Sequence, residues 1–292
     1  MKRVSGTLRE VKRSLAILRK SKRGLLGFSI ITLFLLVGFI GPLIVPLDLR
    51  IHADEIYAPP SSKHLLGTDY AGRDIFSFIV NATPDILSVG FLAGFITTLI
   101  GVSVGITSGF KGGKIDSLLM ALVDFVLTIP SLPLILVIGV LIRGIVGNIF
   151  VLATLLSITR WASLARSVRS RVLALREREF IDAAETLGLS SSHIIFRELL
   201  PNISSYIAIN FIYAMMGAIN GQVGLYFLGV LPYTSVNWGV MLNMAMGEGS
   251  YMTTSATHYL LAPLVTLVLL QVGMVSLCFG LDEILNPKLR TE

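Results

Sequence analysis

Long apolar stretches separated by shorter polar segments dominate the chain. A helix that crosses the hydrocarbon core of a bilayer needs about 20 mostly apolar residues, because the core is about 30 Å thick and an α-helix rises about 1.5 Å per residue. Six stretches meet this requirement, at residues 25–47, 86–110, 118–142, 145–165, 203–231 and 259–281. The pattern therefore predicts an all-α integral membrane protein with six transmembrane helices.

The composition supports a membrane protein. Of the 292 residues, 53% are hydrophobic and 14% are charged, and the mean hydropathy is +0.78. A water-soluble domain carries roughly 25% charged residues, which it needs to cover its surface. The chain has too few charges for that, so a helical bundle in a membrane explains it better.

The placement of Lys and Arg predicts the orientation. Twenty of these 24 residues fall on one side of the six-span topology: nine up to residue 23, two in 111–114, seven in 160–197 and two after 281. The other four fall on the opposite side: Arg50, Lys63, Arg73 and Arg143. Because cytoplasmic loops carry the excess of Lys and Arg, we expect both termini in the cytoplasm. The net charge of +6 thus needs no nucleic-acid partner.

The spans divide the chain into five parts. These are a cytoplasmic tail at 1–24, a first anchor helix at 25–47, an extracytoplasmic segment at 48–85, a five-helix core at 86–281 and a cytoplasmic tail at 282–292. The core includes a cytoplasmic loop at 166–202. A second outward loop, 232–258, contains Trp238, Tyr233 and Tyr251. We expect it to be a re-entrant or interfacial segment with aromatic anchoring, and contact with solute or with a docking protein is the alternative.

Polar groups within the predicted spans are few. Asp124 is the only acidic residue well inside a span, and it is either functional or bonded to a neighbouring helix or to nearby backbone. Arg160 interrupts the fourth span and could reach the membrane interface by snorkelling. Four amides could line a solute path or bond between helices: Asn210, Asn220, Gln222 and Gln271.

Glycines at a spacing of four predict close helix packing. Gly101, Gly105 and Gly109 recur on the second span, and Gly217 and Gly221 on the fifth. Small residues at this spacing let two helix backbones approach each other, which is how helices associate within lipid.

The cytoplasmic loop has the pattern of two short helices. Phe180, Ala183, Ala184 and Leu187 follow the i, i+3, i+4, i+7 spacing and would share one helix face. Gly188 stands where a helix C-cap glycine is expected. After it, Ser190 or Ser191 could cap a second helix at 194–199, which Pro201 would end before the fifth span. The small alanine pair suits a groove on a partner protein, whereas an amphipathic helix lying on the lipid interface remains the alternative.

This loop resembles the EAA loop of binding-protein-dependent ABC importer permeases. The family pattern is Glu-Ala-Ala, three residues, Gly, nine residues, Ile, one residue and Leu-Pro. The corresponding residues keep this spacing: Asp182, Ala183, Ala184, Gly188, Glu198, Leu200 and Pro201. Asp182 replaces the usual Glu, and Glu198 places a charge where the family has an apolar residue.

A second segment narrows the resemblance. The run HLLGTDYAGRD from His64 to Asp74 is similar to the HPLGTDxxGRD segment that follows the first span in dipeptide and oligopeptide permease subunits. Leu65 stands in place of the usual Pro. The two motifs occur in the family's order and on the expected sides of the membrane.

The resemblance implies a type I ABC importer permease fold in the cell membrane. Such a subunit would form half of a path for dipeptides or oligopeptides, together with a second related permease, two cytoplasmic ABC ATPase subunits and an extracytoplasmic solute-binding protein. The ATPases would dock on the EAA loops. The residues expected to couple them to the permease are Asp182, Ala183, Ala184, Glu185, Gly188, Leu200 and Pro201.

No catalytic residue, metal site or bound cofactor is expected on this chain. It has no Gly-x-x-x-x-Gly-Lys-Ser/Thr loop of the type that cradles nucleotide phosphates. ATP and Mg would therefore bind to the partner ATPase subunits.

The sequence is also compatible with other functions. The same machinery could import oligosaccharides or nickel. An ion-coupled secondary transporter would need intramembrane polar groups that coordinate ions, which are scarce here, and a membrane-embedded enzyme would need a cluster of His, Glu or Cys that the sequence does not contain.

Overall fold

The computed structural model describes residues 21–145, 147–250 and 252–285, and these residues are mainly helical. Within them, β-type pairing is limited to an isolated bridge between Thr68 and Asp74. Most of the predicted tails, 1–24 and 282–292, lies outside the described residues. The chain forms two compact units: unit 1 contains the described parts of Met1–Val89, Gly139–Ile149 and Ile219–Glu292, and unit 2 contains Gly90–Ile138 and Phe150–Ala218.

Four continuous helical stretches in the described residues are long and apolar enough to cross a membrane. They are α2 (Lys22–Ile44), α3 (Ile75–Lys111), the run Ser191–Phe227 that ends with α10 (Leu200–Phe227), and α12 (Thr257–Leu285). Two bent helix pairs also pass when each is taken as one span, which raises the number to as many as six.

The third and fourth predicted spans are not straight helices. α4 (Gly113–Thr128) and α5 (Ser131–Leu141) meet at an angle of 79°. The break falls at Ile129 and Pro130, because proline disfavours helical geometry in the residue before it and lacks an N–H of its own. α6 (Ile149–Ser157) and α7 (Arg160–Arg176) meet at 53°, so Arg160 begins α7 and does not interrupt a helix.

The second predicted span begins earlier than residue 86. α3 starts at Ile75 and includes Pro84, so the segment between the first two spans ends at residue 74 and not at 85. The polar residues before 86 made this part look like a loop. Their side chains find partners: the Asn81 amide donates to the Ser77 carbonyl at 2.8 Å and to the Val45 carbonyl at 3.0 Å.

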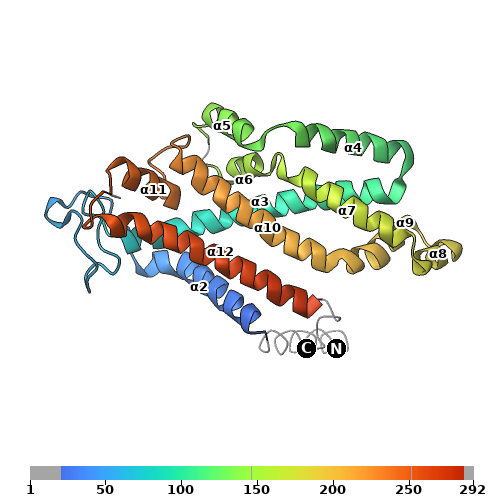
Figure 1. Ribbon diagram of the computed structural model, residues 1–292, viewed down its shortest axis with the longest axis horizontal. Coiled ribbons are helices and arrows are strands. Elements are labelled where there is room, and N and C mark those ends of the chain that lie inside the picture. The colour runs from blue at the N-terminus through green and yellow to red at the C-terminus, as the bar shows by residue number, and fades with distance from the viewer. Residues whose placement is uncertain (1–20, 146, 251, 286–292) are drawn as a thin grey trace. The chain divides into compact units, whose positions relative to one another are not determined.

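In unit 1, α2 and α12 form a close antiparallel pair (Figure 1). A Cβ atom at Gly24 would lie 2.8 Å from the Cα of Gly280, and one at Gly27 would collide with the backbone of Leu277. The start of α2 therefore lies beside the end of α12. The two described ends of the chain share one end of unit 1, as an even number of crossings requires.

The second outward loop folds into α11 (Trp238–Gly247), which packs against α12 in unit 1. Trp238 is fully buried, its indole N–H donates to the Ile79 carbonyl at 3.2 Å, and its ring lies 6.1 Å from that of Phe34. Trp238 therefore does not supply the interfacial anchoring that was expected of this loop. Its side chain belongs to the core, where it contacts Phe34 of α2 and Ile79 of α3.

In unit 2, α7 packs along the glycine-bearing face of α3 (Figure 1). A Cβ at Gly101 would lie 3.0 Å from the Leu164 side chain, and one at Gly109 would lie 2.9 Å from Val172, while Gly105 faces Ala165 and Val168. The predicted close packing at this glycine pattern is confirmed.

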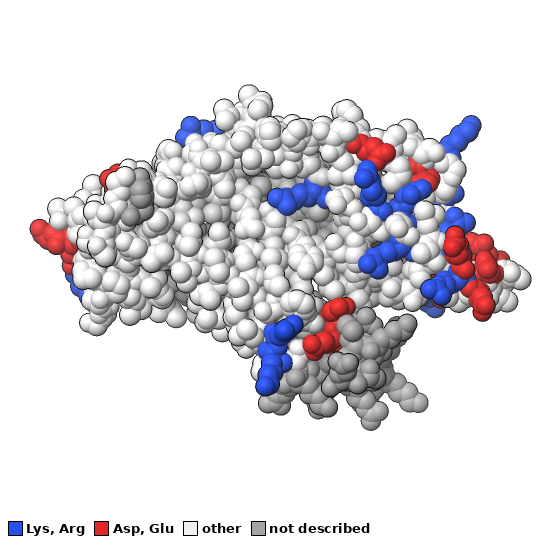
Figure 2. Space-filling view, in the orientation of Figure 1, with Lys and Arg blue, Asp and Glu red and all other residues white. Residues whose placement is uncertain are grey.

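Ion pairs join α4 to α7 in unit 2. The Arg169 guanidinium donates twice to the Asp116 carboxylate at 2.5 Å, and Ser108 of α3 donates to the same carboxylate. Arg166 pairs with Asp124, so the structure shows the bond to a neighbouring helix that was one of the alternatives for Asp124. Figure 2 shows charged side chains of both signs gathered in this part of unit 2 and over the adjoining loop.

Candidate functional site

The loop that carries the EAA-like sequence forms a helical hairpin at the end of α7. α8 (Glu179–Thr186) is followed by α9 (Ser191–His193) and by a π-helical turn, η2 (Ile194–Leu199), which leads directly into α10. We call residues 179–199 the α8–η2 hairpin. Two helices joined by a turn were predicted here, and their existence is confirmed.

The turn of the hairpin depends on Gly188. Its φ is +68°, in the left-handed region that side chains disfavour. The Leu189 N–H donates to the Ala184 carbonyl at 3.1 Å, and the Gly188 N–H donates to the Glu185 carbonyl at 2.9 Å. This pair of bonds is the Schellman motif that ends a helix at a glycine, so the predicted C-cap is confirmed. On the far side, the Ser190 hydroxyl accepts from the His193 N–H and caps α9.

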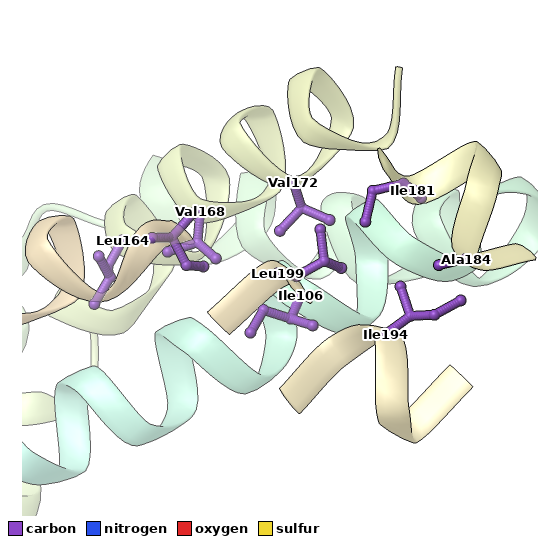
Figure 3. Packing of buried hydrophobic residues seen from close by; sticks show 9 residues of the cluster. Ile106, Leu164, Val168, Val172, Ile181, Ala184, Ile194 and Leu199 are labelled. Atoms are coloured by element: carbon purple, nitrogen blue, oxygen red, sulfur yellow. The ribbon is translucent and has the colours of Figure 1, made fainter. Parts of the chain in front are cut away.

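A hydrophobic cluster holds the hairpin against the bundle of unit 2. Ile181 and Ala184 of α8 point towards Ile194 and Leu199 of η2 (Figure 3). The same cluster continues into α3 and α7 through these buried residues: Ile106, Leu164, Val168 and Val172. Because this packing is continuous, the hairpin and the helices beneath it should move together.

The exposed surface of the hairpin differs from the predicted face. Ala184 is 5% exposed and belongs to the cluster, whereas Phe180 and Leu187 are 38% and 77% exposed and Ala183 also faces outward. The four positions therefore do not present one surface. The i, i+3, i+4, i+7 spacing identified the helix, but Ile181 sets its inward direction because Ile181 is the large apolar side chain that the cluster buries.

Asp182 and Glu185 are exposed, as is Gly188. Together with Phe180, Ala183 and Leu187 they make up the outer surface of the hairpin, which is acidic at two positions and apolar at three. We call these six residues the outer hairpin surface. Both polar and apolar groups are therefore exposed on this surface.

Pro201 does not end the second helix of the hairpin. The helical run Ser191–Phe227 is continuous, and Pro201 is the second residue of α10. The Leu200 N–H bonds to the Ile195 carbonyl, five residues back. This wider π-helical turn relieves the backbone where the proline ring would clash with an α-helical turn and where proline has no N–H to donate. Leu200 is half-buried and Pro201 is exposed.

Glu198 also fits the turn without burying its charge. Leu199, the next residue, is fully buried in the cluster, while Glu198 is partly exposed and its carbonyl accepts from the Asn202 amide at 2.7 Å. The apolar contact expected at the Ile position of the family pattern is thus made by the neighbouring leucine.

The four candidate solute-path amides have different surroundings. The Gln271 amide of α12 donates to Asn220 of α10 at 3.0 Å, and both line a shallow pocket of about 460 Å³ in unit 1. Asn210 donates to the Tyr206 carbonyl of its own helix at 2.8 Å. Gln222 is fully buried within unit 1.

Sequence reasoning missed Asp85. The Gln222 amide donates to the Asp85 carboxylate at 2.7 Å, linking α10 to α3, and the Asn237 side chain at the start of α11 lies next to the same carboxylate. Asp124 is therefore not the only acidic residue well inside a long apolar helix. Asp85 escaped notice because Pro84 precedes it and suggested a loop.

The HLLGTDYAGRD segment folds into a compact turn structure between α2 and α3. The Asp69 carboxylate accepts from the backbone N–H groups of Ala71 and Arg73 at 2.8 and 2.9 Å. The Arg73 guanidinium also donates to this carboxylate, at 2.7 Å. Gly67 and Gly72 have φ of +77° and +73° and abut His258 and the His52 carbonyl, which leaves no room for a side chain.

Contacts between charged or ionisable side chains connect different parts of this segment. His64 hydrogen-bonds Asp74 at 2.7 Å, and Lys63 pairs with Glu55. The hydrogen bond from Lys63 is the main reason that the pKa of the Glu55 carboxyl is lowered from its ordinary value. Glu55 ends the short 3-10 helix η1 (Ala53–Glu55), so these bonds tie η1 to the motif. Among the residues that the structure describes, no group of three His, Cys, Asp or Glu could hold a metal ion.

Comparison with known proteins gives a family match. Residues 101–291 match the family model described as "Binding-protein-dependent transport system inner membrane component". This range includes α4 to α12 and the whole α8–η2 hairpin.

Three relatives show how far the similarity extends. The chain is 33% identical over 279 residues to the dipeptide transport system permease protein DppC of Bacillus subtilis, covering 94% of this chain and 84% of the relative. It is 30% identical to the oligopeptide transport system permease protein OppC of the same organism, covering 93% and 88%. The OppC protein of Mycobacterium tuberculosis H37Rv is 33% identical over 245 residues, covering 84% and 82%.

Proposed function

Because this chain belongs to the family of binding-protein-dependent transport system inner membrane components, we propose that it is one permease subunit of an ATP-binding-cassette importer. It forms half of the translocation path for dipeptides or oligopeptides. The observation that carries the proposal is the similarity over 94% of the chain to a dipeptide permease, which extends to both motifs identified in the sequence.

The proposed complex has four further components. A second related permease completes the path, two cytoplasmic ATPase subunits bind and hydrolyse ATP with Mg, and an extracytoplasmic binding protein delivers the peptide. The permease itself is not catalytic. In the proposed topology the chain crosses the membrane six times and both termini are in the cytoplasm. The α8–η2 hairpin then faces the ATPases, and the HLLGTDYAGRD segment faces the binding protein.

The α8–η2 hairpin is the proposed coupling element. ATP binding can reorient the bundle only if the ATPases hold the two conformations of the permease with different free energies through a physical contact. The outer hairpin surface supplies the contact. The cluster beneath it (Figure 3) transmits the motion, because close-packed side chains shift as a unit.

The proposed coupling residues then divide by role. Asp182, Ala183 and Glu185 contact the ATPase directly. Ala184 and Leu200 pack the hairpin against the bundle. The backbone conformation at two residues sets its shape: the left-handed turn at Gly188 and the π-helical turn that precedes Pro201.

Transport by the reconstituted complex tests the proposal. Proteoliposomes that contain this chain, its partner permease and the ATPases should take up a labelled dipeptide when the loaded binding protein is outside and ATP is inside. Vanadate should stop the uptake, and an ionophore that collapses ion gradients should leave it unchanged.

The opposite pattern would sink the proposal. Uptake that persists with vanadate and stops with the ionophore would identify an ion-coupled secondary transporter. A binding protein that delivers an oligosaccharide or nickel, with no peptide transport, would retain the importer mechanism and replace the cargo.

A further inference from the structure

Arg160 is a cation in unit 2 that has no carboxylate partner there. In the described part of that unit, the carboxylates on α4 pair with other arginines, Asp116 with Arg169 and Asp124 with Arg166. The remaining acidic residues follow α7 and lie in or near the α8–η2 hairpin. Arg160 itself is exposed, and within the described residues of this unit no carboxylate lies at ion-pair distance from its guanidinium.

The guanidinium of Arg160 lies over α10 at Gly217. A Cβ atom at position 217 would be 3.0 Å from the guanidinium carbon and would collide with one of its terminal nitrogens. The guanidinium thus occupies the space that a side chain at position 217 would take, and a larger residue there would displace it. This explains Gly217 better than the helix–helix packing predicted from its spacing with Gly221.

The guanidinium does not reach towards the charged end of unit 2. α7 runs from Arg160 towards Arg169 and the hairpin, whereas side chains on a helix lean towards its N-terminus, away from that end. Gly217 is 17 residues beyond Leu200, or about 25 Å along α10 at 1.5 Å per residue. The charge therefore lies far from the hairpin along the helices, and it does not snorkel towards the hairpin end of unit 2.

Unsatisfied hydroxyls occur at the same level. Gly101 of α3 faces Leu164 of α7, and one turn earlier on each helix stand Thr97 and Arg160. The hydroxyls of Thr97 and of the adjacent Thr159 are buried and make no hydrogen bond, although buried polar groups normally do. At the level of Arg160, the described part of unit 2 thus contains two hydroxyls without a hydrogen bond and one cation without a carboxylate partner.

We propose that Arg160 binds the carboxylate of the peptide as it passes through the permease. This inference rests on the proposed function. A path that must carry peptides of many sequences can rely only on groups that all of them share, and every unmodified peptide has a C-terminal carboxylate. A guanidinium matches a carboxylate in charge and in planar geometry, and an exposed one binds weakly enough to let the solute leave.

The first test compares a dipeptide that has a free C-terminus with its C-terminal amide, in the complete reconstituted transporter. Arg160→Gln should lower uptake of the free acid about tenfold, the effect of losing one charge-assisted hydrogen bond, and should change uptake of the amide less than about twofold. Uptake of the free acid by Arg160→Lys should lie between that of wild type and that of Arg160→Gln, because lysine keeps the positive charge but lacks the paired N–H donors of the guanidinium. Arg143→Gln is the matched control, since Arg143 is exposed and lies outside the helices, and it should resemble wild type with both peptides.

The second test needs no transport of the amide. Phenylglyoxal modifies guanidinium groups, and mass spectrometry can follow Arg160 and Arg143 separately in the wild-type complex. The free acid should slow modification of Arg160, the amide should not, and Arg143 should react at the same rate throughout.

Three results would overturn the assignment. Arg160→Gln could lower uptake of both peptides equally, or Arg160 could be protected without peptide, either of which points to a carboxylate on the partner permease. Protection that follows anionic lipid and not peptide would point to a lipid phosphate. Failure of wild-type ATP-driven uptake would instead remove the proposed function itself, which the uptake experiment detects before any variant is made.

Discussion

Ala183 and Ala184 are neighbours in α8 whose side chains meet different surroundings. Ala184 is 5% exposed and contacts the cluster that includes Ile181 and Ile194, while Ala183 faces outward beside Leu187. An identical substitution at the two positions therefore separates binding at the outer hairpin surface from folding of the hairpin.

Ala183→Glu should leave the protein folded, because an exposed helical position tolerates Glu at a cost of a few tenths of a kcal/mol. It should nevertheless uncouple ATP hydrolysis from transport by adding bulk and charge to the docking surface. Ala184→Glu should destabilise the hairpin by about 3 kcal/mol or more, since it buries an unpaired carboxylate. The measurements are peptide-stimulated ATPase activity and protease resistance of the hairpin. Equal protease sensitivity of the two variants would contradict the different burial of the two alanines.

The structural role of Gly188 could be predicted from the sequence, whereas the surroundings of Arg160 could not. A glycine after an amphipathic segment of suitable length identifies a helix C-cap, and φ of +68° bears this out. The surroundings of Arg160 depend on Gly217, 57 positions away in the sequence. No local pattern connects two such residues.

Among the elements, the segment between α2 and α3 is stabilised largely by polar contacts. The lowered pKa of the Glu55 carboxyl, due first to its hydrogen bond with Lys63, means that the folded segment binds fewer protons than the unfolded one near the ordinary value of 4.5. The stabilisation is therefore complete above that value and is lost as the pH falls through the lower, folded pKa.

Hydrogen exchange should detect this loss. After correction for intrinsic rates, amide protection across residues 53–74 should be constant from about pH 7 to about pH 5.5 and should fall below about pH 4. Lys63→Met should reduce protection already at neutral pH and should flatten the acid response. An unchanged acid response in the variant would assign the effect to another carboxyl of the segment, such as Asp48, whose pKa is also lowered by its hydrogen bonds with Arg50.

The sequence predicted that a helix exists more accurately than it predicted where the helix begins and ends. The break at Pro130 follows from proline stereochemistry, yet Pro84 and Pro201 lie inside helical runs. The difference arises from their surroundings. A π-helical turn precedes Pro201, and polar side chains on the first turns of α3 bond to backbone groups near Pro84.

For the whole molecule, the question is whether each bent pair crosses the membrane. The described ends of α2 and α12 share one end of unit 1, which fits either four or six crossings. In unit 2, the end of α7 returns to the end of α3, where Arg176 donates to the Gly109 carbonyl at 3.4 Å. The two bent pairs together therefore leave and return at the same end of α3.

Cysteine labelling distinguishes the two topologies. Cys278, the one cysteine of the chain, is buried and can be replaced by Ala. In that background, Arg143→Cys between α5 and α6 should react with a membrane-impermeant maleimide in intact cells if both pairs cross. Lys63→Cys should behave in the same way, and Leu187→Cys on the hairpin should react only after permeabilisation. Reaction of the cysteine at 143 only after permeabilisation would establish four crossings with two re-entrant pairs.

The sequence by itself determined that this protein lies in a membrane, approximately where its long helices are, that the glycine-bearing face of α3 is closely packed, and that a helical hairpin with a glycine turn follows α7. Each of these follows from properties that are local along the chain: hydropathy over about 20 residues, the spacing of small residues, and the φ that only glycine adopts easily.

The tertiary structure decided which side of each helix faces inward. It buried Ala184 and exposed Ala183, joined Gln222 to the overlooked Asp85, and enclosed Trp238. It also left Arg160 without a carboxylate partner among the described residues of its unit. Burial and pairing are set by contacts between segments far apart in the chain. The free energy of a charge or an amide depends on which neighbours those contacts bring, and periodicity along one helix cannot supply that information.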